Sequence, residues 1–185
     1  MIIHTIGHST RTLDELVGLL GLNRIDLLAD IRAAPASRRV PHFAKSALEQ
    51  ELSGRGIAYV HLAGLGGLRK GVRGSVNAGW RNASFRAFAD YMQEPEFWSG
   101  LQELLELAGG RSVAIMCAEA VPWRCHRTLV ADALVINGAE VRHITGKGEP
   151  SRHSLTPFAA VDGGRIVYPE QGGAAPRPDK LPTHG

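Results

Sequence analysis

The residues best suited to chemistry are concentrated in one segment, 116–127. It holds a carboxylate, a histidine, two arginines and both cysteines of the chain: Cys117, Glu119, Arg124, Cys125, His126 and Arg127. An apolar, β-rich run at 111–115 precedes this segment, and a helical apolar pattern at 128–135 follows it. A polar cluster at the carboxyl end of a buried strand lies where open α/β sheets bind ligands. The segment therefore predicts a functional site.

Three chemistries are compatible with these residues, and we rank them anion binding, thiol nucleophile, metal. A helix amino terminus beside Arg124 and Arg127 is typical of phosphate or carboxylate sites. Cys117, between a strand and a helix, is expected to have a lowered thiol pKa, but the spacing to Arg124 is one residue too long for a phosphatase loop. Cys117, Glu119, Cys125 and His126 offer the ligand atoms of a metal site, but the cysteines lack paired C-x-x-C spacing, so a metal is only weakly supported and no residue is assigned as a ligand. We interpret Cys125 as a buried packing residue.

Polar residues also follow three other predicted strands. These groups are Gly7–Thr10, Asp30–Arg39, and His61 with the glycine-rich, basic run 64–81. Because parallel strands end at one edge of a sheet, we expect all four groups to build one site. The candidate catalytic residues are His8, Asp30, Cys117 and Glu119, and the candidate anion-binding residues are Ser9, Arg32, Ser37, Arg38, His61, Arg124, His126 and Arg127. We expect His8, Asp30, Arg32, His61 and Glu119 to line one pocket.

Each of these groups also has a structural interpretation. Ser9 or Thr10 can cap the following helix. Arg32 can pair with Asp30 or Glu119 only to hold the sheet edge together. His61 alone is typical of a half-buried histidine, and the basic run 64–81 is either a solvated surface loop or a lid.

The elements that position these residues alternate along the chain. We predict strands at 2–6, 25–31, 57–62, 113–117 and 140–144. Capping-box patterns at Thr12–Glu15 and Ser46–Glu49 each predict a helix start, and further helices are predicted at 85–92, 95–107 and 123–136. This alternation predicts an α/β fold of three layers, a mainly parallel five-stranded sheet with helices on both faces. We expect one domain over 1–170, with a hairpin or extension strand at 161–168, and a disordered tail over 171–185.

Composition narrows the class of protein. The 185 residues carry a formal charge of +3, which permits a small anionic or nucleic-acid ligand. Two cysteines do not form a disulfide framework, and the expected helix would carry Cys125 away from Cys117, so we predict no structural disulfide. The start of the chain lacks a secretory signal and no apolar stretch is long enough to span a membrane, so we expect a cytoplasmic protein without membrane contact. No motif for an organic cofactor is present, and the oligomeric state is left open.

Several of these motifs together resemble a known family. They are Thr5–Ser9, Asp30–Ser37, Leu65–Gly67, Cys117–Glu119 and Cys125–Arg127. In order and spacing they are similar to the family named domain of unknown function 488, over about residues 2–168. The resemblance implies an α/β fold, a cytoplasmic bacterial or archaeal protein, and importance for these motifs, but it supplies no substrate.

Two function classes follow. The first is an enzyme, a hydrolase or group transferase acting on a phosphate-bearing substrate such as a nucleotide or nucleic acid, with a thiol-based enzyme using Cys117 as a variant. The second is a non-catalytic nucleotide or nucleic-acid binding module, in which Trp80, Trp123 or Tyr59 stacks on bases. For the enzyme we expect Arg32 and Arg124 to contribute most to anion binding, and Arg32→Lys to weaken that binding while leaving thermal stability nearly unchanged.

Overall fold

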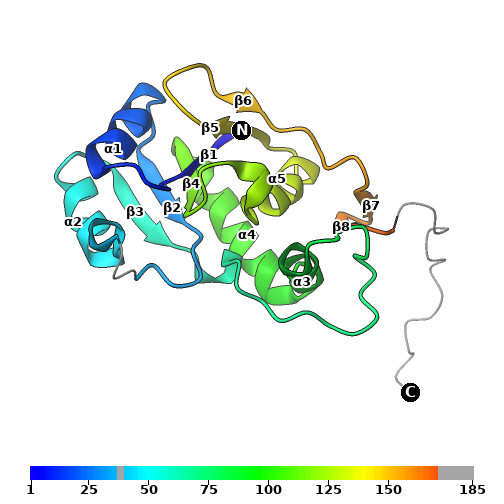
Figure 1. The fold of residues 1–185 in the computed structure, drawn as a ribbon. Helices are drawn as coiled ribbons and strands as arrows, with labels where there is room; N and C mark the ends of the chain where they lie inside the picture. The colour runs from blue at the N-terminus through cyan, green and yellow to red at the C-terminus, as the bar shows by residue number, and fades with distance from the viewer. Residues whose placement is uncertain (37–39, 171–185) are drawn as a thin grey trace.

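The computed structural model describes residues 1–36 and 40–170, and its centre is a mostly parallel, mixed sheet (Figure 1). The strand order is β3-β2-β4-β1-β5-β6. The parallel strands are β1 (Ile2–Gly7), β2 (Leu27–Asp30), β3 (Ala58–His61), β4 (Val113–Cys117) and β5 (Glu140–Ile144). The predicted α/β fold is confirmed. The sheet has six strands rather than five, because the chain turns back after β5 and adds the short antiparallel strand β6 (Ser151–Arg152).

Helices cover both faces of the sheet. The helices α1 (Leu13–Leu22) and α2 (Lys45–Ser53) lie on one face, and α3 (Ala83–Tyr91), α4 (Pro95–Ala108) and α5 (Arg127–Ile136) pack on the other (Figure 1). Strand β4 shows why both faces are covered: Ala114 and Met116 pack with α1 and α2, whereas Ile115 and Cys117 pack with α4 and α5. A strand buried on both faces needs apolar residues throughout, as its sequence has.

The predicted hairpin near the end of the described chain is confirmed. Strands β7 (Ala160–Asp162) and β8 (Arg165–Val167) pair antiparallel across Gly163 and Gly164, both of which have positive φ. Their segment packs against α5, through Ile166 and Tyr168. The predicted tail, 171–185, lies outside the described residues.

Two predicted helix starts differ from the structure. The capping box at Thr12 and Glu15 is present, but the one at Ser46 is not, because α2 begins at Lys45 after Ala44 and Ser46 lies inside the helix. Helix α5 begins at Arg127, not 123. Residues Pro122–Arg124 form a separate 3₁₀ turn, η3, and Cys125 after it is extended. The helical conformation is therefore interrupted between η3 and α5. Cys125 and His126 lie at this interruption and not inside a continuous helix.

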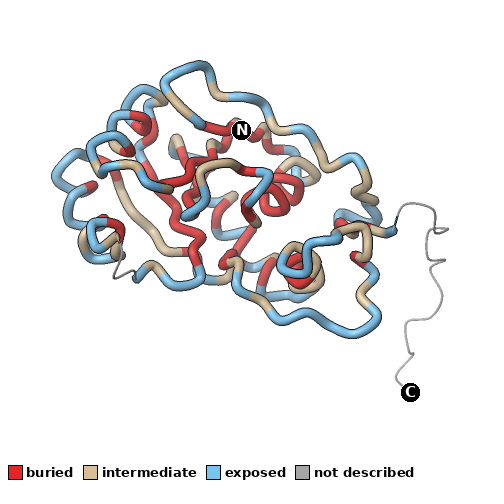
Figure 2. The backbone as a smooth tube through the Cα atoms, in the orientation of Figure 1, coloured by how far each residue is buried: buried red, intermediate tan, exposed pale blue. Residues whose placement is uncertain are grey.

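The carboxyl ends of the parallel strands meet at one edge of the sheet. The strand cores and most of α5 are buried, whereas several of the segments that leave the strands are exposed (Figure 2). Two further 3₁₀ turns, η1 (Pro41–Phe43) and η2 (Ala63–Leu65), follow β2 and β3 at this edge. Within the described ranges, none of the helices has the length and apolar character needed to cross a membrane.

Candidate functional site

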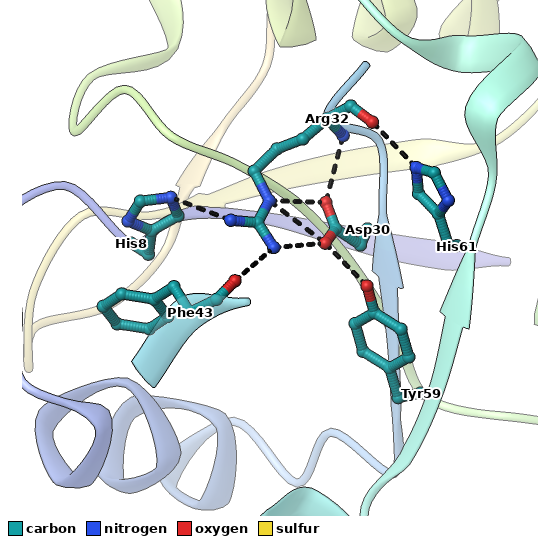
Figure 3. A network of polar contacts seen from close by, with 6 residues as sticks. All are labelled: His8, Asp30, Arg32, Phe43, Tyr59 and His61. Carbon is teal, nitrogen blue, oxygen red and sulfur yellow. Dashed lines mark hydrogen bonds and ion pairs between the residues drawn. The ribbon is translucent and has the colours of Figure 1, made fainter. Parts of the chain in front are cut away.

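A buried ion pair lies at the end of β2 (Figure 3). The Arg32 guanidinium donates to both carboxylate oxygens of Asp30, through Nε at 2.9 and 3.0 Å and through Nη2 at 2.6 Å. Nη2 also donates to the carbonyl of Phe43 at 2.8 Å. Asp30 is fully buried and Arg32 is 7% exposed. Most of the donors of Arg32 are therefore directed into the protein rather than toward a ligand.

His8 and Tyr59 complete the ion-pair cluster. Tyr59 donates its hydroxyl to Asp30 at 2.8 Å, and burial and the Asp30 carboxylate raise the pKa of Tyr59 well above its usual range. His8 stacks on Phe43, and its Nε2 lies 3.4 Å from Arg32 Nη1. Burial, and then the Arg32 charge, lower the pKa of His8, so its imidazole is expected to be neutral at pH 7.

Two histidines hold the backbone that follows β2. His61, from β3, donates Nε2–H to the carbonyl of Arg32 at 2.8 Å. His126 donates Nε2–H to the preceding carbonyl, that of Ile31, at 3.1 Å. Because both histidines bond consecutive carbonyls, the ion-pair cluster is joined directly to the segment that carries the cysteines.

Cys117, Cys125 and His126 form a second group, the thiol–imidazole cluster. The sulfur atoms of both cysteines lie 3.7 Å from His126 Nδ1, and both thiols are free. The expected helix was to carry Cys125 away from Cys117. That reasoning is wrong, because η3 and the extended Cys125 return the chain to the end of β4.

The two cysteines differ in the direction of their pKa shifts. Interaction with the Cys117 thiol lowers the pKa of Cys125. The same interaction, together with burial, raises the pKa of Cys117. The sequence predicted Cys117 as the reactive thiol and Cys125 as a packing residue. Cys125 lies just before α5, where the backbone N–H of Arg127 reaches its sulfur at 3.5 Å, a contact that favours a thiolate.

The thiol–imidazole cluster opens on a cavity of about 400 Å³. The polar residues of its wall are Arg32, Ser84, Cys117, Glu119, Arg124, Cys125 and His126, and the remaining wall is formed by Ala33, Ala34, Gly67, Leu68, Phe85 and Ala118. Glu119 and Arg124 are exposed. Their side chains make no hydrogen bond or ion pair with the described part of the chain, so both are free to meet a ligand.

Close backbone contacts explain two glycines of the sequence motifs. A Cβ on Gly67 would lie 2.4 Å from His126 Nδ1, and a Cβ on Gly7 would lie 1.8 Å from the carbonyl oxygen of Glu119. Arg127 supports the loop that contains Glu119 and Ala120. It is buried, and its Nη2 donates to the carbonyls of Glu119 and Ala120 at 2.7 and 3.3 Å. Arg127 therefore positions the cavity wall rather than forming part of it.

The structure brings some of the predicted site residues together and separates others. Arg32, Cys117, Glu119, Arg124 and His126 line the cavity, whereas His8, Asp30 and His61 lie beside it in the ion-pair cluster, so the single pocket expected for His8, Asp30, Arg32, His61 and Glu119 is not formed as such. Ser9 lines a different, shallow hollow with Thr10, Arg11 and Glu15. Ser37 and Arg38 lie outside the described residues. Sequence reasoning missed Cys125 as a site residue, although its position directly before His126 pointed to it.

The model of a protein family described as domain of unknown function DUF488 matches residues 12–134. This match covers more than half of the chain, and the chain therefore belongs to the DUF488 family. Neither the curated proteins nor the solved structures contain a match to it.

Proposed function

We propose that this member of the DUF488 family is an enzyme, a hydrolase or group transferase whose active site is the cavity beside the thiol–imidazole cluster. One observation carries the proposal: ionisable sulfur, imidazole and carboxylate groups converge with an unpaired arginine on one cavity of about 400 Å³. That volume is in the range of small-molecule sites. Its position beyond the carboxyl ends of parallel strands is where such folds bind their ligands.

Charge at the cavity indicates an anionic substrate, such as a nucleotide or another phosphate-bearing small molecule. Arg124 is exposed in the cavity wall with its guanidinium unpaired in the described chain, whereas the charge of Arg32 is already compensated by Asp30. A guanidinium can bind phosphate oxygens through two parallel hydrogen bonds. Apolar wall residues, among them Leu68 and Phe85, suit the uncharged body of such a molecule.

Glu119 is the group suited to proton transfer. Its carboxylate is exposed in the cavity and can transfer a proton to or from a substrate. The thiol–imidazole cluster lies in the same wall, with its sulfur and nitrogen atoms close together, whereas His8 and Asp30 do not line the cavity. The geometry therefore favours chemistry at Glu119 and the thiol–imidazole cluster over a route that uses only His8 and Asp30.

The aromatic residues favour an enzyme over a nucleic-acid binding module. Trp80 packs against Phe85, Phe158 and Tyr168, and Tyr59 donates its hydroxyl to Asp30. Of the three residues proposed to stack on bases, Trp123 alone is strongly exposed. A stacking platform normally needs several such rings along a strand.

The test is turnover of a panel of phosphomonoesters, phosphodiesters and nucleotides by the purified protein. We expect Glu119→Gln to lower kcat and Arg124→Ala to raise KM about tenfold, the effect of losing one exposed charge-assisted contact. The matched controls are Glu103→Gln and Arg111→Ala, exposed residues outside the cavity wall. Equal kcat/KM for all four variants would show that this cavity is not the active site. Nucleic-acid binding without turnover would favour the binding module.

A further inference from the structure

We propose that Cys117, Cys125 and His126 bind one zinc ion, which keeps a fourth coordination position open toward the cavity. Metal binding is independent of the proposed reaction, whereas the use of the open position rests on the proposed function. The three ligand atoms lie within 4.8 Å of one another. They come from the end of β4 and from the start of α5, two elements that the fold packs together.

The two distances from sulfur to nitrogen fit a tetrahedral zinc site. Zinc lies about 2.3 Å from a thiolate sulfur and about 2.0–2.1 Å from an imidazole nitrogen, which sets the two atoms about 3.6 Å apart. Both sulfurs are 3.7 Å from His126 Nδ1. An ion can therefore enter between the three atoms with little movement of the chain.

The tautomer of His126 is set for metal binding. Its Nε2 is 3.1 Å from the carbonyl of Ile31, which can only accept, so the proton is on Nε2. The lone pair of Nδ1 is then directed to the two sulfurs. A ligating histidine usually donates its other N–H to a backbone carbonyl or carboxylate in this way, and the bond fixes the orientation of the ring.

The surroundings stabilise negative sulfur. The backbone N–H of Arg127 contacts Cys125 Sγ at 3.5 Å, and the buried guanidinium of Arg127 holds the loop that follows Cys117.

Gly67 lies beside His126 Nδ1, where any Cβ would come within 2.4 Å of the nitrogen. A larger residue at 67 would therefore occupy space that the ion and its ligands need.

The number of ligands points to an open site. In the described ranges, the cluster contains three metal-ligating side chains and no fourth. Structural zinc sites are almost always closed by four protein ligands, whereas three ligands and one exchangeable position are typical of catalytic zinc. The cavity borders all three ligands and also Glu119. In the proposed enzyme, zinc would lower the pKa of water at the fourth position, and the Glu119 carboxylate would accept the proton of that water. The hydroxide would attack the phosphorus of a phosphate ester, the bond from phosphorus to the leaving oxygen would break, and protonated Glu119 would return the proton to that oxygen.

The experiment measures zinc binding by the full chain with its thiols kept reduced. Metal-free protein is titrated with Zn²⁺ in competition with a chromophoric chelator, and the zinc content is determined after gel filtration. We expect one zinc per chain. Cys117→Ser, Cys125→Ser and His126→Gln should each weaken binding at least a hundredfold, and His42→Gln, an exposed histidine outside the cluster, should leave it unchanged. Wild-type protein that retains no zinc overturns the proposal.

Cobalt substitution reports the coordination geometry and the ligand types by absorption spectroscopy. The spectrum of the wild-type protein does not depend on whether any variant folds. Co²⁺ in the wild-type protein should give intense tetrahedral d–d bands and a thiolate-to-cobalt charge-transfer band. His126→Cys, which retains a ligand, should keep the ion and strengthen the charge-transfer band. Added imidazole should shift the d–d bands, since the fourth position exchanges. A spectrum indifferent to imidazole overturns the open position.

The two proposals fail separately. Substrate turnover by zinc-free, reduced protein would support the proposed enzyme and show that zinc is not used in catalysis. One tightly bound zinc per chain, lost in the three ligand variants but without turnover of any substrate, would support the site and count against the proposed function.

Discussion

The burial of Arg32 changes what this residue is expected to do. Sequence reasoning assigned it to an anionic ligand, but its Nε and Nη2 groups bind Asp30 and the Phe43 carbonyl inside the protein. A buried charge that loses part of its pairing is costly, and lysine cannot reproduce the two-pronged contact of a guanidinium. The geometry thus favours the structural interpretation that the sequence left open.

We therefore expect Arg32→Lys to lower the free energy of unfolding by about 2–3 kcal/mol. This reverses the expectation from sequence alone, that thermal stability would be nearly unchanged. The control is Arg142→Lys, whose half-exposed pair with Glu140 should contribute under about 1 kcal/mol. Chemical denaturation of the two variants makes the comparison. Equal stability of Arg32→Lys and the wild type would contradict the structural interpretation and favour the prediction that Arg32 binds an anion.

A second prediction at the scale of single residues concerns Gly67. A Cβ at this position would lie 2.4 Å from His126 Nδ1, so Gly67→Ala must displace the imidazole or the loop. We expect a loss of at least tenfold in Zn²⁺ affinity. Gly71→Ala is the control, because its Cβ would meet the nearest atom, the Ala87 Cβ, at an ordinary 3.8 Å. Chelator competition measures both, and unchanged affinity in Gly67→Ala would show that the ring does not need this space.

At the scale of elements, the sequence predicted the helices and strands well but not every helix start. The pattern Thr12-Leu13-Asp14-Glu15 forms a capping box, in which Glu15 N–H donates to the Thr12 hydroxyl and the Glu15 carboxylate accepts from Thr12 N–H. The equivalent letters at Ser46 and Glu49 do not form one, because α2 begins one residue before Ser46. The preceding turn η1 fixes that start, and only tertiary structure reveals it.

This pair of motifs gives a matched test. Thr12→Ala removes a formed cap and should lower the free energy of unfolding by about 1 kcal/mol. Ser46→Ala changes a residue inside the first turn of α2, without a side-chain bond that caps the helix, and should have an effect within about 0.5 kcal/mol. Urea denaturation of both variants decides between them. A cost for Ser46→Ala as large as that for Thr12→Ala would mean that α2 begins with the predicted box after all.

The site depended on one local irregularity that periodicity did not predict. The apolar pattern of 123–136 reads as a single helix, but Pro122–Arg124 form η3 and Cys125 is extended. This break brings Cys125 and His126 close to Cys117. The seven residues between the two cysteines are enough for the chain to turn back to the end of β4. Rules for metal sites that rely on close sequence spacing miss ligands that a turn brings together. The location of the candidate site was thus predictable from the strand ends, but the approach of Cys125 to Cys117 and His126 was not.

At the scale of the whole molecule, a polar network fastens the last described segment to the sheet and α5. The buried carboxylate of Asp132, in α5, accepts from His153 at 2.8 Å, from the Thr156 hydroxyl at 2.6 Å and from the Tyr168 hydroxyl at 2.9 Å. His153 contacts His143 of β5 at 3.0 Å, and His143 contacts Thr5 of β1 at 2.8 Å. The sequence predicted the parallel sheet but could not predict this network, since it joins residues up to 138 positions apart.

The His143 side chain makes this network sensitive to acid. Burial, followed by the nearby His153 and Arg127, lowers the pKa of His143 to about 4, against a smaller opposing effect of Asp132. The unfolded chain, with an ordinary histidine pKa near 6.5, therefore binds more protons than the folded chain between about pH 6.5 and pH 4. Stability must fall as the pH falls through this window, and this contribution levels off below pH 4.

From these values, we expect His143 to account for a loss of up to about 2 kcal/mol between pH 7 and pH 5. The pKa values of His4 and His8 are also lowered by burial, so the total slope is steeper and a difference between variants is required. His143→Gln keeps a group that can donate and accept but removes the titration, and its stability should depend less on pH by that amount. Gln50→Asn, exposed and outside the network, should keep the wild-type slope. Urea denaturation at half-unit steps from pH 7 to pH 4 measures all three proteins. If His143→Gln parallels the wild type throughout, proton uptake at His143 does not limit stability, and the acid sensitivity comes from other groups, such as His4 and His8.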